Sequence, residues 1–220
     1  MAYPAGIGPY GLLPINLEGG RAYAGAIRKI PLTSGYAQNI GYGDFVTYSS
    51  AADGTVVRVD TSAGGEATFA APPVGVFLGC QYVQSSGTKF PLWSQFWSTG
   101  TTVLQDNENY GYGWAYVCED PDAIFVATVS DGSGNLYTSG GATQASVGLN
   151  AGYYVKTGLV NTTTGDSLVT VNLASAATTN TLPLRIVDVV RSTALSDGTY
   201  QQVLVTFNAG FHFYRQTTGI

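Results

Sequence analysis

Short runs rich in Val, Ile, Phe, Tyr and Thr recur along the chain, and Gly, Pro, Asn or Asp separates each run from the next. This pattern is typical of β-strands joined by turns, and the 3.6-residue repeat of amphipathic helices is nearly absent. A chain of 220 residues, 45% of them apolar, can fill the core of one large domain. We therefore expect an all-β protein, built as a single β-barrel or a jelly-roll-like sandwich.

Several turns and strands can be placed from local signals. Asp53-Gly54 separates GYGDFVTYSS from TVVRVD and predicts a hairpin, because Asp-Gly accepts the positive φ angles of a tight turn. The run from Ala70 to Val83 predicts a buried strand with a proline-led entry. Within it, Gly75 and Gly79 indicate bulges or close approaches of the backbone.

Two regions carry weaker strand signals. Residues 1–35 hold four of the nine prolines, with glycines between them, so we expect an extended N-terminal arm before a domain at 36–220. Residues 135–181 are rich in Gly, Ala, Ser, Thr and Asn and predict a loop-rich insertion of peripheral loops and edge strands. The last part restores strong strand signals, and a final hairpin around Asp197-Gly198 is expected to close the core.

The surface chemistry is unusual, because only 10% of the residues are Asp, Glu, Lys or Arg, against about a quarter in typical soluble domains. With a net charge of -5 and nine scattered basic residues, we expect no nucleic-acid partner. No apolar run approaches ~18 residues, so no membrane-spanning helix is expected. The N-terminus lacks the features of a secretory signal, which predicts a protein that stays in the cytoplasm where it is made. A virus particle is the commonest destination for such a chain.

Residues suited to catalysis or metal binding are few. His212 is the only histidine and no Gly-x-Ser-x-Gly motif accompanies it, so we expect it to be a packed or interface residue. Cys80 and Cys118 lie in apolar runs, which favours buried free thiols over a disulfide and falls short of a zinc site. The acidic run 119–122 and the DGSGN sequence at 131–135 are expected to be turns. We therefore predict no enzyme, no cofactor and no metal.

Aromatic side chains are concentrated between residues 89 and 116. Such rings can fill a core, form the centre of a protein interface or stack against sugar rings. All three interpretations stay open, since exposure cannot be read from sequence. The residues concerned are Phe90, Trp93, Phe96, Trp97, Tyr110, Tyr112, Trp114 and Tyr116.

Seven motifs are spread over most of the chain in a distinctive order. They are PYGLLPINLEGGRAYAGAIRKI (9–30), GDFV (43–46), PPVGVFLGCQY (72–82), EDPDAIF (119–125), LPLRIVDVV (182–190), VLVTFN (203–208) and the terminal TTGI (217–220). In this order the motifs resemble the capsid decoration, or cement, proteins of tailed bacteriophages. Residues 135–181 contribute little to the resemblance.

The resemblance implies a β-barrel or jelly-roll-like protein that binds the outer face of the phage capsid, often as a homotrimer, and stabilises the shell. The implied partner is the major capsid protein, the implied location is the virion surface, and no catalytic residues come with it. The arm would lie across a neighbouring subunit, with Arg21, Arg28 and Lys29 facing acidic shell surface. Together with Trp93 and Trp97, these residues form the candidate capsid interface.

Two rival functions also belong on a virion. A glycan-binding or host-adhesion module would use the aromatic residues and the 135–181 region, and an exposed row of Trp or Tyr rings in a shallow groove would favour it. The major shell subunit is less favoured, because large shell folds need a long helix and the sequence predicts none.

Overall fold

The computed structural model describes residues 8–51, 53–87, 89–105, 111, 113–193 and 200–217. Over these residues the regular structure consists of strands and single-turn 3-10 helices, which confirms the all-β prediction. The strands are β1 (Leu13–Leu17), β2 (Arg21–Ala22), β3 (Arg28–Pro31), β4 (Phe45–Tyr48), β5 (Val56–Arg58), β6 (Gly64–Glu66), β7 (Gly75–Val83), β8 (Pro91–Ser94), β9 (Gly113–Cys118), β10 (Ala123–Ser130), β11 (Asn150–Val160), β12 (Ser167–Ala177), β13 (Leu184–Val189) and β14 (Gln202–Phe207). The 3-10 helices are η1 (Glu18–Gly20), η2 (Gln144–Ser146), η3 (Arg191–Thr193) and η4 (Phe213–Arg215).

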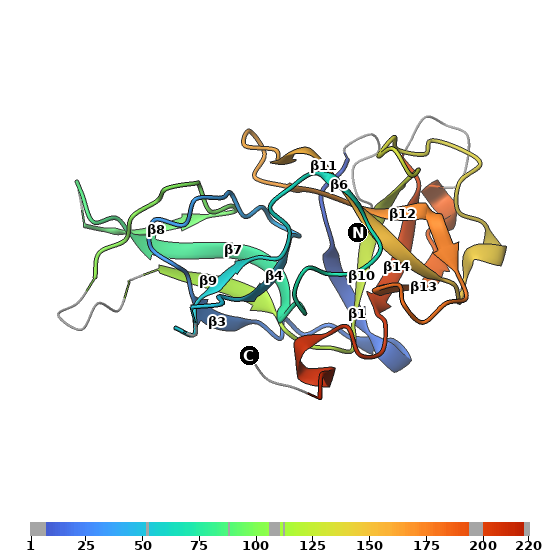
Figure 1. Cartoon of the computed structure of the whole chain (residues 1–220), viewed down its shortest axis with the longest axis horizontal. Coiled ribbons are helices and arrows are strands. Elements are labelled where there is room, and N and C mark those ends of the chain that lie inside the picture. The colour runs from blue at the N-terminus through green and yellow to red at the C-terminus, as the bar shows by residue number, and fades with distance from the viewer. Residues whose placement is uncertain are drawn as a thin grey trace.

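A closed β-barrel forms the right-hand part of the molecule in Figure 1. Its strand order is β12-β11-β13-β14-β10, and a parallel pairing of β10 with β12, with Val129 opposite Val171, closes the ring. β1 and β2 extend this sheet beyond β10, and β6 pairs with β11.

A second sheet extends to the left in Figure 1, with the order β3-β9-β7-β4-β5. A parallel bridge between Leu32, just after β3, and Val56 of β5 brings its two edges together. β7 has two neighbours on one side, because its first part pairs with β4 and its second part pairs with β8. β8 therefore lies at the end of the molecule farthest from the barrel.

Two hydrophobic cores meet at β4 and β7, strands of the second sheet that contribute side chains to both cores. Phe45 and Val76 belong to the barrel core, whereas their neighbours Val46 and Phe77 belong to the core of the second sheet. Successive side chains of a strand point to opposite faces, so one strand can serve both cores. The Phe45 ring lies 4.7 Å from that of Phe69 in an edge-to-face contact, the geometry that aromatic pairs prefer.

Residues 8–35 are largely extended but do not form a separate arm, which corrects the expectation for this part of the segment 1–35. β1 pairs with β10 in the barrel sheet, and β3 pairs with β9 in the second sheet. Leu12, Ile30 and Leu32 are almost completely buried. The prolines exclude a helix without excluding burial, and removing this segment would take a strand from each sheet. Residues 1–7 lie outside the described residues.

The segment 135–181 supplies two strands of the barrel, β11 and β12, each of 11 residues. This corrects the expectation of a loop-rich insertion with edge strands. Tyr153 and Val171 lie in the barrel core. Small residues serve close packing here: a Cβ at Gly152 would collide with the backbone oxygen of Glu66 on β6.

Several local predictions are confirmed. β4 and β5 form the expected hairpin around Asp53-Gly54, and β13 and β14 form the final antiparallel pair. A Cβ at Gly75 would collide with the backbone oxygen of Cys118, which is the expected close approach. Gly79 has a φ of 115° at a break in the β7–β9 register, as a bulge requires. The turn Asp197-Gly198 lies outside the described residues.

A buried ion pair lies at the junction of the barrel and the second sheet. Arg58, at the end of β5, places Nη2 3.0 Å from Oδ1 of Asp44, just before β4, and both side chains are at most 1% exposed. Backbone Gly41 donates to Asp44 Oδ2 at 2.6 Å. Burial raises the pKa of Asp44, and the Arg58 charge opposes that rise. The low exposure of both side chains shows that the ion pair is shielded from solvent.

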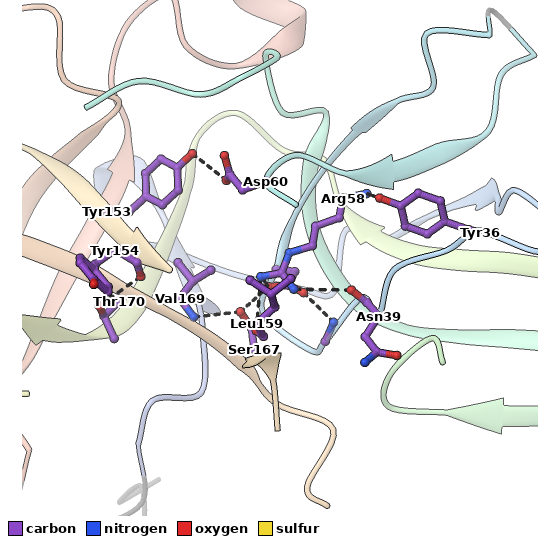
Figure 2. A network of polar contacts seen from close by, with 12 residues as sticks. Tyr36, Asn39, Arg58, Asp60, Tyr153, Tyr154, Leu159, Ser167, Val169 and Thr170 are labelled. Carbon is purple, nitrogen blue, oxygen red and sulfur yellow. Dashed lines mark hydrogen bonds and ion pairs between the residues drawn. The ribbon is translucent and has the colours of Figure 1, made fainter. Parts of the chain in front are cut away.

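The barrel supplies two further partners of this ion pair, as Figure 2 shows, while Arg58 Nη1 also donates to the backbone oxygen of Asn39 at 3.5 Å. Ser167, the first residue of β12, donates its hydroxyl to Asp44 Oδ1. Arg58 Nη2 donates to the backbone oxygen of Leu159 on β11 at 3.3 Å. Charged groups from one sheet are thus satisfied by polar groups of the other, as buried ions require. The two sheets are fixed together by these bonds.

A second polar link lies beside the first in Figure 2, where Tyr153 of β11 donates its hydroxyl to Asp60 Oδ2 at 2.7 Å. Burial raises the pKa of Asp60 to about 6. The hydrogen bond from Tyr153 and the charge of Arg58 oppose the rise, whereas Glu66 and Asp44 add to it. Asp60 is therefore easier to protonate in the folded protein than in the unfolded chain.

Replacing Asp44 by Ala should leave the Arg58 guanidinium buried without a counter-ion and lower the free energy of unfolding by about 3–5 kcal/mol. Urea denaturation followed by circular dichroism measures this. The matched control is the double variant Asp44→Leu/Arg58→Met, which should lose clearly less, because neither charge is left alone. A loss below about 1 kcal/mol in Asp44→Ala would show that the ion pair does not join the sheets.

The raised pKa of Asp60 makes its contribution to stability greatest below about pH 4, with a loss as the pH rises through about 6. Asp60→Asn should remove this loss and stabilise the protein at pH 7 by up to about 3 kcal/mol relative to the parent chain, with little difference at pH 4. Urea midpoints at the two pH values measure the effect. An equal effect of the substitution at both pH values would contradict the assignment.

Candidate functional site

The outer face of the second sheet gathers aromatic and polar side chains from four adjacent strands. Lys29 on β3 pairs with Tyr116 on β9, Gln81 on β7 pairs with Trp114 on β9, and Gln81 also pairs with Trp93 on β8. Directly paired residues of antiparallel strands project to the same face. We call these five residues the outer-face row. Ile30, Cys80 and Ala115, the next residues along three of these strands, are buried on the inner face.

Three members of the outer-face row are held by one another. Gln81 Oε1 accepts hydrogen bonds from Lys29 Nζ at 3.2 Å and from Tyr116 Oη at 3.0 Å. Lys29 Nζ also lies 5.2 Å from the centre of the Trp114 ring and 5.6 Å from that of Tyr116. Such cation–π contacts at exposed sites are worth about 0.5–1 kcal/mol each. The row thus presents ordered rings with one positive charge.

Exposed apolar side chains also gather at and just before β8, where they lie on both faces of the sheet edge. Phe90 is 71% exposed, Trp93 67% and Leu92 39%. We call these three residues the β8 patch. Large apolar side chains that gather on a surface commonly mark a contact with another molecule.

Of the five predicted interface residues, Lys29 and Trp93 lie on the outer face of the second sheet, whereas Trp97 does not. Trp97 is fully buried, with its ring 5.4 Å from that of Tyr82 in the core of the second sheet. The expectation that Trp97 lies at an interface is therefore wrong, because its backbone pairs with Ile40 and turns the ring inward. Tyr110 and Tyr112 lie outside the described residues.

The other two predicted residues, Arg21 and Arg28, pair with acidic groups of the same chain. Arg21 lies 3.7 Å from Asp122, and Arg28 Nη1 lies 3.1 Å from Glu119 Oε2. Both pairs are solvent-exposed and contribute little to stability. Their charges are largely neutralised within the chain, which weakens the expectation that they face an acidic shell surface.

Arg28 and Glu119 line an open hollow together with Tyr214, which the sequence did not indicate. Arg28 Nη1 donates to Tyr214 Oη at 2.7 Å, and Tyr214 Oη donates to Glu119 Oε2 at 3.0 Å. Burial and the neighbouring Tyr48 and Glu119 raise the pKa of Tyr214, so it stays a neutral donor. No sequence signal links Tyr214 to Glu119 and Arg28, which lie 95 and 186 positions away.

The imidazole and the two thiols of the described residues are buried. His212 is fully buried, and burial lowers its pKa to about 4. Cys80 and Cys118 are buried free thiols, as predicted, and burial raises the pKa of Cys80 to about 12. Asp44 and Ser167 belong to the sealed junction. The imidazole and the thiols are thus inaccessible and uncharged at neutral pH, which suits them to packing.

Other local features of the described residues have structural roles. The acidic run 119–122 forms the expected turn, in which Asp122 N donates to Asp120 Oδ1 at 2.9 Å. The 131–135 sequence is also a turn, in which Asp131 accepts bonds from backbone Ser133 and Asn135. Across these residues there is no group of three His, Cys, Asp or Glu side chains placed to bind a metal ion. None of the described helices has the length and apolar character needed to span a bilayer.

Comparisons with protein-family models, with curated proteins and with solved structures find no match to this chain.

Two tryptophans four residues apart should behave in opposite ways. Trp97→Ala should cost about 3–5 kcal/mol of unfolding free energy, because it opens a cavity in the second core. Trp93→Ala should change it by less than about 0.5 kcal/mol, since the side chain is mostly exposed. Urea unfolding measures both. Equal losses in the two variants would mean that Trp93 is part of the fold rather than of a contact surface.

Proposed function

We propose that this chain is a virion structural protein that binds the outer surface of a phage capsid and stabilises the shell. The observation that carries the proposal is the exposed aromatic surface of the outer-face row, together with the exposed apolar side chains of the β8 patch at the adjoining sheet edge. Aromatic residues are enriched among the side chains that dominate protein interfaces, and charged residues are depleted at interface centres. The order of the seven sequence motifs supports the same function.

Stabilisation would follow from mass action. A protein that binds the assembled lattice and not the free subunits lowers the free energy of the lattice alone, so disassembly becomes less favourable. Rigid rings suit this role, because little conformational entropy is lost when they are buried. The major capsid protein is the proposed partner, and the process requires no chemical step.

A second candidate function is glycan binding on the virion surface. It is favoured by one observation: Trp93, Gln81 and Trp114 lie in one cross-strand row, so rings and an amide share a face. Sugar rings stack on aromatic faces while amides bond to their hydroxyl groups. Lys29 already covers the rings of Trp114 and Tyr116, however, which leaves Trp93 as the open platform.

Co-sedimentation of the purified chain with empty mature shells, followed by electron microscopy, tests the primary proposal. The parent chain should saturate defined positions on the shell. Lys29→Glu and Trp93→Ala should each weaken binding by about tenfold or more, because each alters the outer-face row. Arg191→Glu, an exposed charge reversal on η3, is the matched control and should bind like the parent chain.

Binding that is absent, or that is unchanged in both outer-face variants, would contradict the proposed function. Titration of the chain with soluble oligosaccharides, monitored by tryptophan fluorescence, tests the alternative. Saturable quenching that disappears in Trp93→Ala, in a chain that does not sediment with shells, would favour glycan binding instead.

A further inference from the structure

The side to which each backbone N–H and C=O group of β7 points can be derived from the hydrogen bonds at the C-terminal end of the strand. Leu104 N donates to the backbone oxygen of Val83 at 2.8 Å, and Gln84 bridges to Val103. The 102–104 segment must lie on the β9 side of β7, because β8 occupies the other side as far as Val83. Residues two apart in a strand direct their backbone groups to the same side. Gln81 therefore bonds toward β9.

It follows that the residues on either side of Gln81 bond toward β8. Tyr82 pairs with Leu92 and Cys80 pairs with Ser94, so these are the hydrogen-bonded pairs of β7 and β8. Trp93 lies between Leu92 and Ser94, and its N–H and C=O must point away from β7. Among the described strands, β7 is the one that pairs with β8, so Trp93 faces an open sheet edge.

The side chains of β8 are unusual for an open edge. Leu92 and Trp93 project to opposite faces of the sheet, yet both are exposed. Edge strands are usually protected by charged side chains, prolines or bulges. β8 contains no charged residue, and Pro91 is its one protective feature. A further strand laid beside β8 would cover apolar surface on both faces.

We propose that a second copy of this chain pairs with β8 in antiparallel fashion, about a two-fold axis through Trp93. Each Trp93 would then exchange both backbone hydrogen bonds with its counterpart, because a two-fold contact pairs a residue with itself. Leu92 would then lie opposite Ser94 of the other copy.

Charge favours the antiparallel arrangement of two copies over the parallel one. Lys89 is the nearest charged residue before β8. About a two-fold axis at Trp93, the two Lys89 positions are eight residues apart along the ladder, or about 27 Å at ~3.4 Å per residue. In-register parallel pairing would instead place them side by side. A two-fold pair also differs from the homotrimer that the resemblance implies.

Sedimentation velocity of the full chain between about 1 and 200 μM tests the pairing, and it needs no shell, so its result is separate from that of the proposed function. The parent chain should form a dimer. Trp93→Pro should raise the dimer dissociation constant by about thirtyfold or more, because it removes both the outward N–H and the ring. Trp93→Asp, which brings two carboxylates to the axis, should do the same. Ile27→Ser, an exposed apolar residue away from β8, should leave the dimer unchanged.

Thermal unfolding and hydrogen exchange separate this edge pairing from a fault in folding. Leu92→Pro removes an inward N–H and should lower the melting temperature, whereas Trp93→Pro should lower it far less. The Trp93 amide should gain protection from exchange as the parent chain is concentrated. A monomer throughout the concentration range, a trimer, or a dimer that persists in both Trp93 variants would overturn the proposal.

Discussion

The buried pair of Asp44 and Arg58 is the interaction on which the arrangement of the two sheets depends. Its charges belong to the second sheet, but two of its hydrogen-bond partners, Ser167 and Leu159, belong to the barrel. A buried charge without its partners is strongly destabilising, so neither sheet can be displaced without exposing or stranding an ion. Apolar contacts across the junction resist separation, and the ion pair adds a defined geometry to them.

The strand content could be predicted because it is a local property. Alternation of apolar residues and Asp-Gly turns placed β4, β5, β7 and β14 correctly. The assignment of residues 8–35 and 135–181 failed for a different reason: proline and small residues lower local strand propensity, but pairing with distant strands decides the outcome. Position 152 requires a glycine because β6 packs against it, and the neighbouring residues in the sequence give no sign of that contact.

The aromatic and basic residue types of the candidate site could be predicted from the sequence, but their positions in space could not. Trp93 and Trp97 have similar sequence surroundings, but Trp93 lies on the outer face of an edge strand and Trp97 pairs inward with Ile40. Gln81 was missed because an isolated glutamine in a strand gives no signal, and only the register places it between Lys29 and Tyr116. A one-residue shift in register would have exchanged outer and inner residues throughout.

β7 connects the junction of the two sheets to the proposed contact surface, because it pairs with both β4 and β8. One side of β7 is shared, because β4 pairs with its beginning near the junction and β8 pairs with its end. β4 can remain short and buried between two cores, while β8 lies beyond both cores and has one neighbouring strand in the described structure. The rigid junction thus holds one end of β7, and the other end presents Trp93 at an edge whose position is fixed by the same strand. A contact made there by another molecule would be made to a preorganised surface, which lowers the entropy lost on binding.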